Sequence, residues 1–180
     1  MGAPKVKIDV DPVTGVWQTD ELPMIYLPRH FLVNNHKATE NALGRDAYAA
    51  MIQGATDRSA FDWCGAQYQR GGAAAEDIVR LYFERLSQRG WGQFHIDSLD
   101  VANGEMSLSL SNSVFVLEAK EASAQPLCYM FEGFVTGALR FLLPKDQKGG
   151  RFYCQEITCE GQGHNQTCGF KASLISAYRS

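Results

Sequence analysis

The chain has 180 residues, of which 45% are hydrophobic, and a formal net charge of −3 at pH 7. This length and composition fit one domain with a full core rather than a mini-protein that depends on disulfides. The negative charge gives no electrostatic reason to expect a nucleic-acid partner. The apolar runs fall far short of the roughly 20 residues that cross a bilayer, so we expect no membrane span.

The first 34 residues are interpreted as an extended N-terminal arm. Residues 1–22 are mostly polar and contain Pro and Gly, with a short strand predicted at Val6–Val10, and an apolar segment continues the arm at Leu22–Pro28. A loosely attached terminus is the common state of such a segment, and an arm that crosses to a partner subunit is the alternative. Residues 35–180 are expected to form one domain. His30 and His36 lie at the boundary, where capping or surface roles are expected.

Two helical regions follow the arm. The first is predicted at Lys37–Arg70, with a break near Gly44, because its apolar and small residues form a stripe at helical spacing. The second is predicted at Ala74–Arg89, where apolar residues recur every four positions. Gly90 stands where a helix C-cap is expected, so the chain should turn there.

A β-hairpin is predicted after the helices. Its strands are Phe94–Val101 and Glu105–Ala119, and Asn103-Gly104 between them is a strong two-residue turn motif. Apolar residues alternate with serines at the start of the second strand, so one face should be buried and the other polar. Val114–Leu117 is apolar throughout, which predicts that this end of the strand is covered on both faces.

The last third of the chain is predicted to contain one apolar helix and two strands. The helix is expected at Pro126–Leu143, and its glycines Gly133 and Gly137 stand four residues apart, as in a groove for close helix packing. The strands are expected at Arg151–Cys159 and Cys168–Ile175. Together with the hairpin these elements predict an α/β (α+β) fold in which helices pack on an antiparallel sheet.

Four side chains in this region form a candidate metal site. Cys128 is placed in the first turn of the predicted helix, where the positive end of the helix dipole favours a thiolate. Glu156 and Cys159 lie near the end of one predicted strand, and Cys168 opens the next. The residues between the two cysteines are rich in Gly and Asn, so a tight turn can bring them together. Soft sulfur ligands with one carboxylate suit a four-coordinate Zn²⁺ site, although the spacing matches no common zinc-finger pattern.

Alternatives stay open for several of these residues. Glu156 taken alone is an ordinary solvated strand residue, and Glu132 or His164 competes with it for the fourth ligand position. Cys64 and Cys154 are expected to be small buried hydrophobic residues rather than ligands.

A disulfide is the other alternative for the clustered cysteines. The segment Met1–Lys7 has no apolar run behind its charges, so no signal peptide is recognised. We therefore expect a cytoplasmic protein, in which a reducing environment favours a metal over a disulfide.

Three motifs resemble the 4-vinyl reductase (4VR) domain family: Pro-Leu-Cys-Tyr at residues 126–129, Gly-Phe-Val-Thr-Gly at residues 133–137, and the Cys-x8-Cys spacing. The resemblance covers about Asn35 to Ser176. This family includes the aromatic-sensing domains of some bacterial transcriptional activators, in which a Cys at a helix start, a Glu-x-x-Cys pair and a later Cys hold one zinc ion. The resemblance places Cys128, Glu156, Cys159 and Cys168 at those positions. It also implies a fold shared with nitric-oxide-signalling and vesicle-tethering proteins, and a homodimer.

The same resemblance implies a ligand pocket. His95 stands where the sensors have a histidine that hydrogen-bonds a phenolic hydroxyl, and Leu110 stands near the position of their pocket tryptophan. Phe131 and Phe134 on the apolar helix are expected to line the cavity. The ligand is then a small hydrophobic or aromatic molecule.

Two classes of function remain open from the sequence. The first is a zinc-containing, sensor-like binding domain that acts through a regulatory partner protein, because no ATPase or DNA-reading domain accompanies it here. The second is a 4-vinyl reductase-type enzyme or accessory protein of tetrapyrrole (bacteriochlorophyll) metabolism. We favour binding over catalysis because no Gly-x-Gly-x-x-Gly motif between a strand and a helix is present to bind a nicotinamide or flavin.

Overall fold

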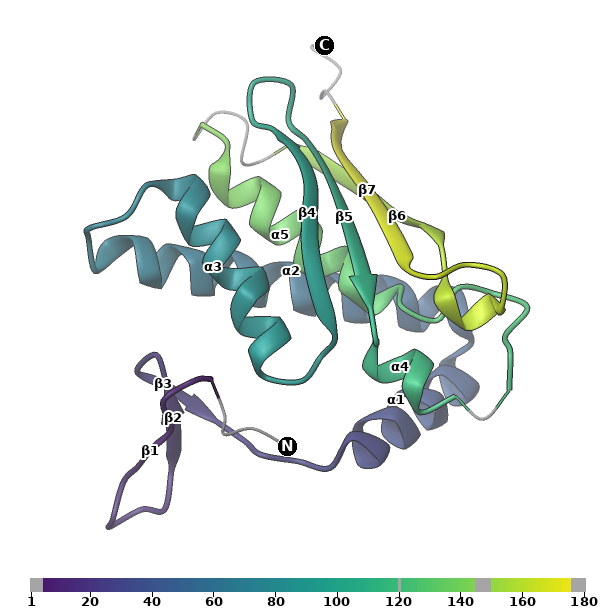
Figure 1. The fold of residues 1–180 in the computed structure, drawn as a ribbon, viewed down its shortest axis with the longest axis horizontal. Helices are drawn as coiled ribbons and strands as arrows, with labels where there is room; N and C mark the ends of the chain where they lie inside the picture. The colour runs from purple at the N-terminus through teal and green to yellow at the C-terminus, as the bar shows by residue number, and fades with distance from the viewer. Residues whose placement is uncertain (1–4, 120, 145–149, 176–180) are drawn as a thin grey trace.

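A computed structural model describes residues 5–119, 121–144 and 150–175 (Figure 1). The ends of the predicted arm and domain, residues 1–4 and 176–180, lie outside these ranges. Along the chain the elements are β1 Asp9–Val10, β2 Trp17–Thr19, β3 Leu22–Met24, α1 Arg29–Leu43, α2 Arg45–Gln69, α3 Ala75–Gln88, β4 Gln93–Asp100, β5 Glu105–Ser111, α4 Val114–Leu117, α5 Met130–Leu142, β6 Arg151–Thr158, a short 3-10 helix Glu160–Gln162, and β7 Cys168–Ile175.

The main sheet is antiparallel and has the strand order β4-β5-β7-β6. Helices α3 and α5 pack on this sheet, and α2 packs against α5 and α3 (Figure 1). The strands alternate as predicted, since Met106, Leu108 and Leu110 of β5 are buried while the serines between them are partly exposed. The predicted α+β class, with helices packed on an antiparallel sheet, is confirmed.

Helices α2 and α5 approach each other closely because of two glycines. A methyl group added at Gly133 would lie 2.1 Å from Thr56 Oγ1, and one added at Gly137 would lie 2.1 Å from the carbonyl oxygen of Asp57. The predicted groove for close helix packing is therefore confirmed, and it receives α2.

The second hairpin strand is shorter than predicted. β5 ends at Ser111, and the expected strand residues Val114–Leu117 form the one-turn helix α4 instead. Asn112 takes a positive φ of 55°, which ends the strand. The Ser113 side chain then accepts a hydrogen bond from the amide of Phe115, an N-cap that starts a helix. Val114 and Phe115 are buried as expected, whereas Leu117 is 54% exposed, so the predicted burial holds only for the start of this segment.

Two further local predictions were wrong. Helix α5 begins at Met130 rather than Pro126, so Cys128 precedes the helix instead of lying in its first turn. The amide of Cys128 is held by the Glu156 carboxylate, 2.7 Å away, which fixes this segment before the helix begins. His36 is neither a cap nor a surface residue: it is 5% exposed, and its Nδ1 lies 2.9 Å from the hydroxyl of Tyr48.

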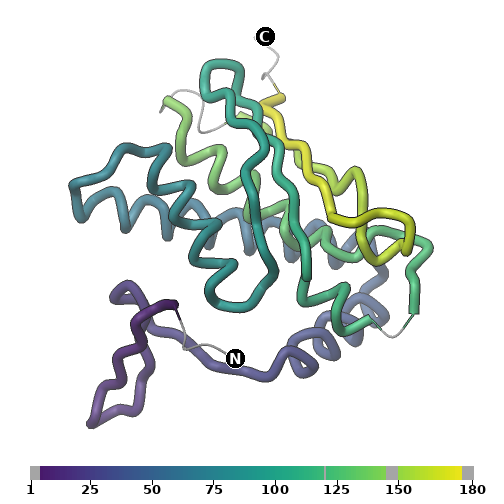
Figure 2. Tube along the Cα trace, viewed as in Figure 1, coloured from purple at the N-terminus to yellow at the C-terminus, as the bar shows by residue number. Residues whose placement is uncertain are grey.

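The N-terminal arm folds into its own three-stranded antiparallel sheet, β1-β2-β3. Figures 1 and 2 show this small sheet beside α3, joined to α1 by an extended segment. The turn between β2 and β3 attaches it to the helices, because Asp20 accepts hydrogen bonds from Arg85 and Arg89 of the α3 region. Helix α1 starts at Arg29, earlier than the predicted Lys37.

Among the helices of the described ranges, none combines the length and the apolar character needed to cross a membrane.

Candidate functional site

The structure brings Cys128, Glu156, Cys159 and Cys168 together from three segments of the chain. Glu156 lies in β6, Cys159 directly follows this strand, Cys168 opens β7, and Cys128 precedes α5. All four are buried, and one ligand atom from each lies within 4.8 Å of the others. The turn between Cys159 and Cys168 folds back as the Gly-rich sequence predicts, with Gly163 at a φ of +81°.

The sulfur separations fit a shared metal ion. Cys128 Sγ lies 3.5 Å from Cys168 Sγ, which in turn lies 3.8 Å from Cys159 Sγ. Two thiolates at about 2.3 Å from a tetrahedral zinc would be about 3.8 Å apart. A disulfide would need a separation of about 2.0 Å, so these cysteines are not bonded to each other.

Glu156 has one oxygen that no described residue satisfies. Its Oε2 accepts the hydrogen bond from the Cys128 amide, whereas Oε1 is buried without a hydrogen-bond partner in the described part of the chain. A buried carboxylate oxygen without a partner costs free energy, and a cation bound among the three sulfurs would remove this cost.

Further groups around the cluster orient the sulfurs. The amide of Leu127 donates to Cys159 Sγ at 3.4 Å, and the amide of Glu160 donates to Cys168 Sγ at 3.3 Å. The Ser113 hydroxyl lies 3.0 Å from Cys128 Sγ. Donors of this kind stabilise thiolates and fix the orientation of metal ligands. These groups were not predicted from the sequence, because two are backbone amides and Ser113 was assigned to a strand.

The electrostatics of the cluster favour a cation. Hydrogen bonds from the thiols of Cys128 and Cys168 lower the pKa of Cys159. Burial, followed by the charge on Cys159, raises the pKa of Glu156. Donation to Cys159 and Cys168, together with burial, raises the pKa of Cys128 well above its usual value. Metal binding at this cluster would therefore release protons, because thiols and carboxyl groups bind a metal ion in their deprotonated forms.

The competing ligand candidates lie elsewhere. Glu132 accepts hydrogen bonds from Gln53 at 2.6 Å and from the amide of Glu156 at 2.9 Å, so its carboxylate supports β6 from outside the cluster. His164 is exposed, and its Nδ1 lies 3.1 Å from the carbonyl of Gln162. Cys64 is buried in the helical core, where burial raises its thiol pKa to about 12.

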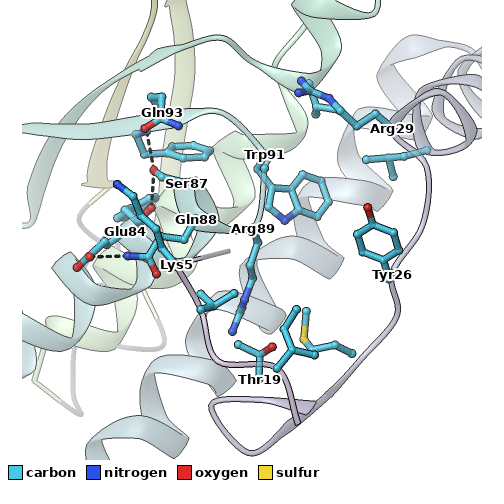
Figure 3. A pocket seen from close by; sticks show the side chains of 18 of the residues that line it. Lys5, Thr19, Tyr26, Arg29, Glu84, Ser87, Gln88, Arg89, Trp91 and Gln93 are labelled. Carbon is cyan, nitrogen blue, oxygen red and sulfur yellow. Dashed lines mark hydrogen bonds between the residues drawn. The ribbon is translucent and has the colours of Figure 1, made fainter. Parts of the chain in front are cut away.

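A cleft of about 1010 Å³ lies between the arm and the body of the domain. Its walls come from the arm, the start of α1, the end of α3 and the start of β4 (Figure 3). Aromatic and basic side chains are among those that line it, including Tyr26, Arg29, Phe83, Arg89, Trp91 and Phe94. Trp91 and the two arginines were not predicted from the sequence as site residues.

The four expected ligand-binding residues are distributed around this cleft rather than gathered in one pocket. His95 is exposed and is the one among them that lines the cleft. Leu110, Phe131 and Phe134 are buried in the core. Phe131 packs with its ring centroid 5.3 Å from that of Phe94, and therefore lies behind a residue that lines the cleft.

Comparisons with solved structures show the same fold in other proteins. The phenol-responsive sensory domain of the transcription activator PoxR, solved with phenol, is 17% identical with a TM-score of 0.76, and the match covers 96% of this chain and 87% of that one. A trafficking protein particle complex subunit 3 from Naegleria fowleri, covalently bound to palmitic acid, is 12% identical with a TM-score of 0.50, and the match covers 84% of this chain and 98% of that one.

Sequence comparison identifies the family of the chain. No curated protein matches it significantly. Residues 2–97 match a family model described as a domain of unknown function (DUF5943), and this segment is more than half of the chain. It contains the arm, α1 to α3 and most of β4, but none of the four clustered ligand residues. The chain therefore belongs to the DUF5943 family.

Proposed function

We propose that this protein is a sensor-like, small-molecule-binding domain that is stabilised by one structural Zn²⁺ ion. The observation that carries the proposal is the cluster of Cys128, Glu156, Cys159 and Cys168, whose ligand atoms all lie within 4.8 Å of one another in the buried interior. Thiolates select soft or borderline metals, and three of them with a carboxylate complete the four-coordinate shell that zinc prefers.

The proposed zinc ion is structural rather than catalytic. A catalytic zinc site keeps one position open for water or substrate, whereas here four protein ligands fill the shell. All four ligand residues are at most 4% exposed, which leaves no direct route for a substrate to the ion.

The proposed ligand is a small hydrophobic or aromatic molecule that binds in the cleft. The PoxR domain, which shares the fold, is bound to phenol in its crystal structure. The resemblance to the 4VR family points the same way. In this chain the open space lies against Trp91 and Phe94, with His95 beside them. Phe131 forms a second aromatic layer in contact with both Trp91 and Phe94, and Phe134 also contacts Trp91. Leu110 is buried in the same core.

The metal site is tested by measuring zinc content in purified variants. Cys159→Ser and Cys168→Ser should each lose zinc and melt several degrees lower, because each removes a ligand from a buried site. Cys64→Ser is the control, since this thiol is buried in the helical core, and it should retain stoichiometric zinc. Equal zinc in all three variants, or no zinc in the parent protein, would contradict the assignment.

The identity of the bound ligand and the number of subunits are tested by native mass spectrometry of protein freshly purified from its own host. The proposal expects one retained small apolar or aromatic molecule per chain and, as the family resemblance suggests, a homodimer. A regulatory partner protein would appear as an additional co-purified mass. A bound tetrapyrrole would instead favour the vinyl reductase alternative.

A further inference from the structure

The cleft is basic although the chain as a whole is acidic. Among the described residues that line it, Lys5, Arg29, Arg80 and Arg89 carry positive charge, whereas Glu84 carries negative charge. The whole chain has a net charge of −3. A concave surface of one sign of charge concentrates ligands of the opposite sign.

Arg29 has hydrogen-bond donors that no described residue satisfies. Its Nε and Nη2 atoms are buried without a hydrogen-bond partner in the described ranges. Arg29 forms a loose ion pair with Glu118, whose Oε1 lies 3.8 Å from Nε, too far for a hydrogen bond. The Arg29 side chain as a whole is 40% exposed and lines the cleft, and its planar guanidinium fork matches a carboxylate.

Arg89 adds to the positive potential on the opposite wall. Its side chain is 12% exposed, and its Nη2 pairs with Asp20 at 2.9 Å. Its Nε is buried and has no hydrogen-bond partner among the described residues. Burial lowers the pKa of Arg89, and the nearby Asp20 carboxylate opposes this shift. Arg89 therefore donates a hydrogen bond from Nη2 to Asp20 on the arm, while its Nε–H has no acceptor among the described residues.

The start of helix α1 adds positive potential on the side of the cleft where Arg29 lies. The helix begins at Arg29 after Pro28, and no side chain caps its first amides. Its first turn also contains no acidic residue. An uncapped helix N-terminus carries partial positive charge, which favours an anion next to it.

Aromatic rings provide the apolar part of the cleft. Figure 3 shows Tyr26 on the arm side and Trp91 on the side of α3. Tyr26 is 83% exposed, and its ring stacks on that of Trp17 with centroids 5.8 Å apart. Phe83 and Phe94 line the same space. A planar aromatic body stacks well on such walls.

We propose that the cleft binds a small aromatic monocarboxylate, with its ring against Trp91 and Phe94 and its carboxylate paired with Arg29. This inference rests on the proposed function, in which the cleft is the ligand site, and it specifies the chemical class of the ligand. The partial positive charge at the start of α1, next to Arg29, supports the same orientation.

The test compares two probes that share a ring system but differ in charge. Zinc-loaded protein is titrated with 2-naphthoate and with the neutral 2-naphthalenemethanol in a calorimeter. Because a charge-assisted pair with Arg29 is available only to the anion, naphthoate should bind about tenfold more tightly. Arg29→Gln should remove most of this preference and leave the affinity for the alcohol unchanged. Arg58→Gln, an exposed position on α2 outside the cleft lining, should preserve the preference.

The possible failures are distinguishable. Equal affinity of the two probes for the parent protein overturns the carboxylate assignment and leaves small-molecule binding in the cleft intact. This comparison needs no variant, so it stands even if Arg29→Gln does not fold. A preference for naphthoate that persists in folded Arg29→Gln overturns the role of Arg29. Absence of binding by both probes removes the cleft as the ligand site and with it that part of the proposed function.

Discussion

At the scale of single residues, Gly133 and Gly137 determine how closely α5 approaches α2. A methyl group at Gly137 would lie 2.1 Å from the carbonyl oxygen of Asp57, a backbone atom that cannot move aside without displacing the helix. We expect Gly137→Ala to lower the free energy of unfolding by about 1–3 kcal/mol, the usual cost of overpacking. Urea denaturation measures this change.

Gly65→Ala on α2 is the matched control. An added methyl group there meets no atom within 4 Å, and Ala favours a helix over Gly by about 1 kcal/mol. This variant should be neutral or more stable than the parent protein. If both variants had the same effect on stability, close helix packing would not be the reason for glycine at position 137.

His36 links stability to pH. Burial lowers its pKa, and the charges of Arg45 and Lys37 act in the same direction, whereas Glu40 opposes them. An imidazole with a lowered folded-state pKa contributes stability above its unfolded value near 6.5, and this stability is lost as the pH falls toward the folded value. Between pH 7.5 and 5.5 the parent protein should therefore lose more stability than His36→Gln, by up to about 1.4 kcal/mol per pH unit.

Urea denaturation across this pH range measures the difference between the two proteins. Subtracting the variant from the parent removes any common contribution from the metal cluster. His30→Gln, at an exposed position on the same helix, should show the pH dependence of the parent protein. Parallel pH profiles for the parent and His36→Gln would show that His36 does not contribute.

The residues of the candidate metal site were predictable from their chemistry and family resemblance, but their backbone setting was not. Sulfur and carboxylate residues next to a Gly-rich turn are visible in the sequence. The position of Cys128 before α5 depends on a hydrogen bond from its amide to Glu156, 28 residues further along the chain. The burial of His36 depends on Tyr48, Phe115 and Tyr129, which pack around its ring. Long-range contacts of this kind leave no local pattern.

At the scale of elements, local patterns predicted most of the helices and strands but failed where a side chain interrupts them. The Asn103-Gly104 turn and the alternation in β5 were sufficient to place the hairpin. The same apolar pattern continues through Val114–Leu117, yet the positive φ of Asn112 and the Ser113 cap convert these residues into a helical turn. The small sheet of the arm was missed because its strands contain only two or three residues each.

Asp20 is the main attachment between this small sheet and the helices. Its carboxylate is 19% exposed and pairs with Arg85 and Arg89 at 3.1 and 2.9 Å. Asp20→Asn keeps a residue that tolerates the positive φ of 53° found there but removes the charge. We expect the docking of the arm to weaken by about 1–2 kcal/mol, which would increase hydrogen exchange in residues 17–24.

Asp9→Asn is the control for this experiment. Asp9 lies in the same small sheet, but its ion pair with Lys7 joins two exposed side chains, and such pairs contribute little. Exchange in residues 17–24 should match the parent protein in this variant. Unchanged exchange in Asp20→Asn would mean that apolar contacts, rather than this ion pair, hold the arm.

At the scale of the whole molecule, the two candidate sites lie in different parts of the chain. With the exception of Val114, the described residues that line the cleft all fall within residues 2–97, the segment that matches the family model. The metal cluster is built by residues 128–168, after that segment ends. The sheet joins the two parts, since β4 carries one wall of the cleft and pairs with β5, which pairs with β7. This arrangement predicts that a metal ion bound at the cluster would stabilise the C-terminal elements locally.

Removal of the metal tests that prediction by hydrogen exchange coupled to mass spectrometry. After chelation, exchange should increase in residues 126–132 and 156–170, because the buried ligands then have no cation to hold their segments together. The exchange of α3 should change little, since this helix packs mainly on α2, α5 and β4. Cys159→Ser without chelator should reproduce the pattern, and Cys64→Ser should not. A uniform increase across the chain would mean that the cluster supports the whole fold, and no increase would mean that protein contacts alone hold the C-terminal elements.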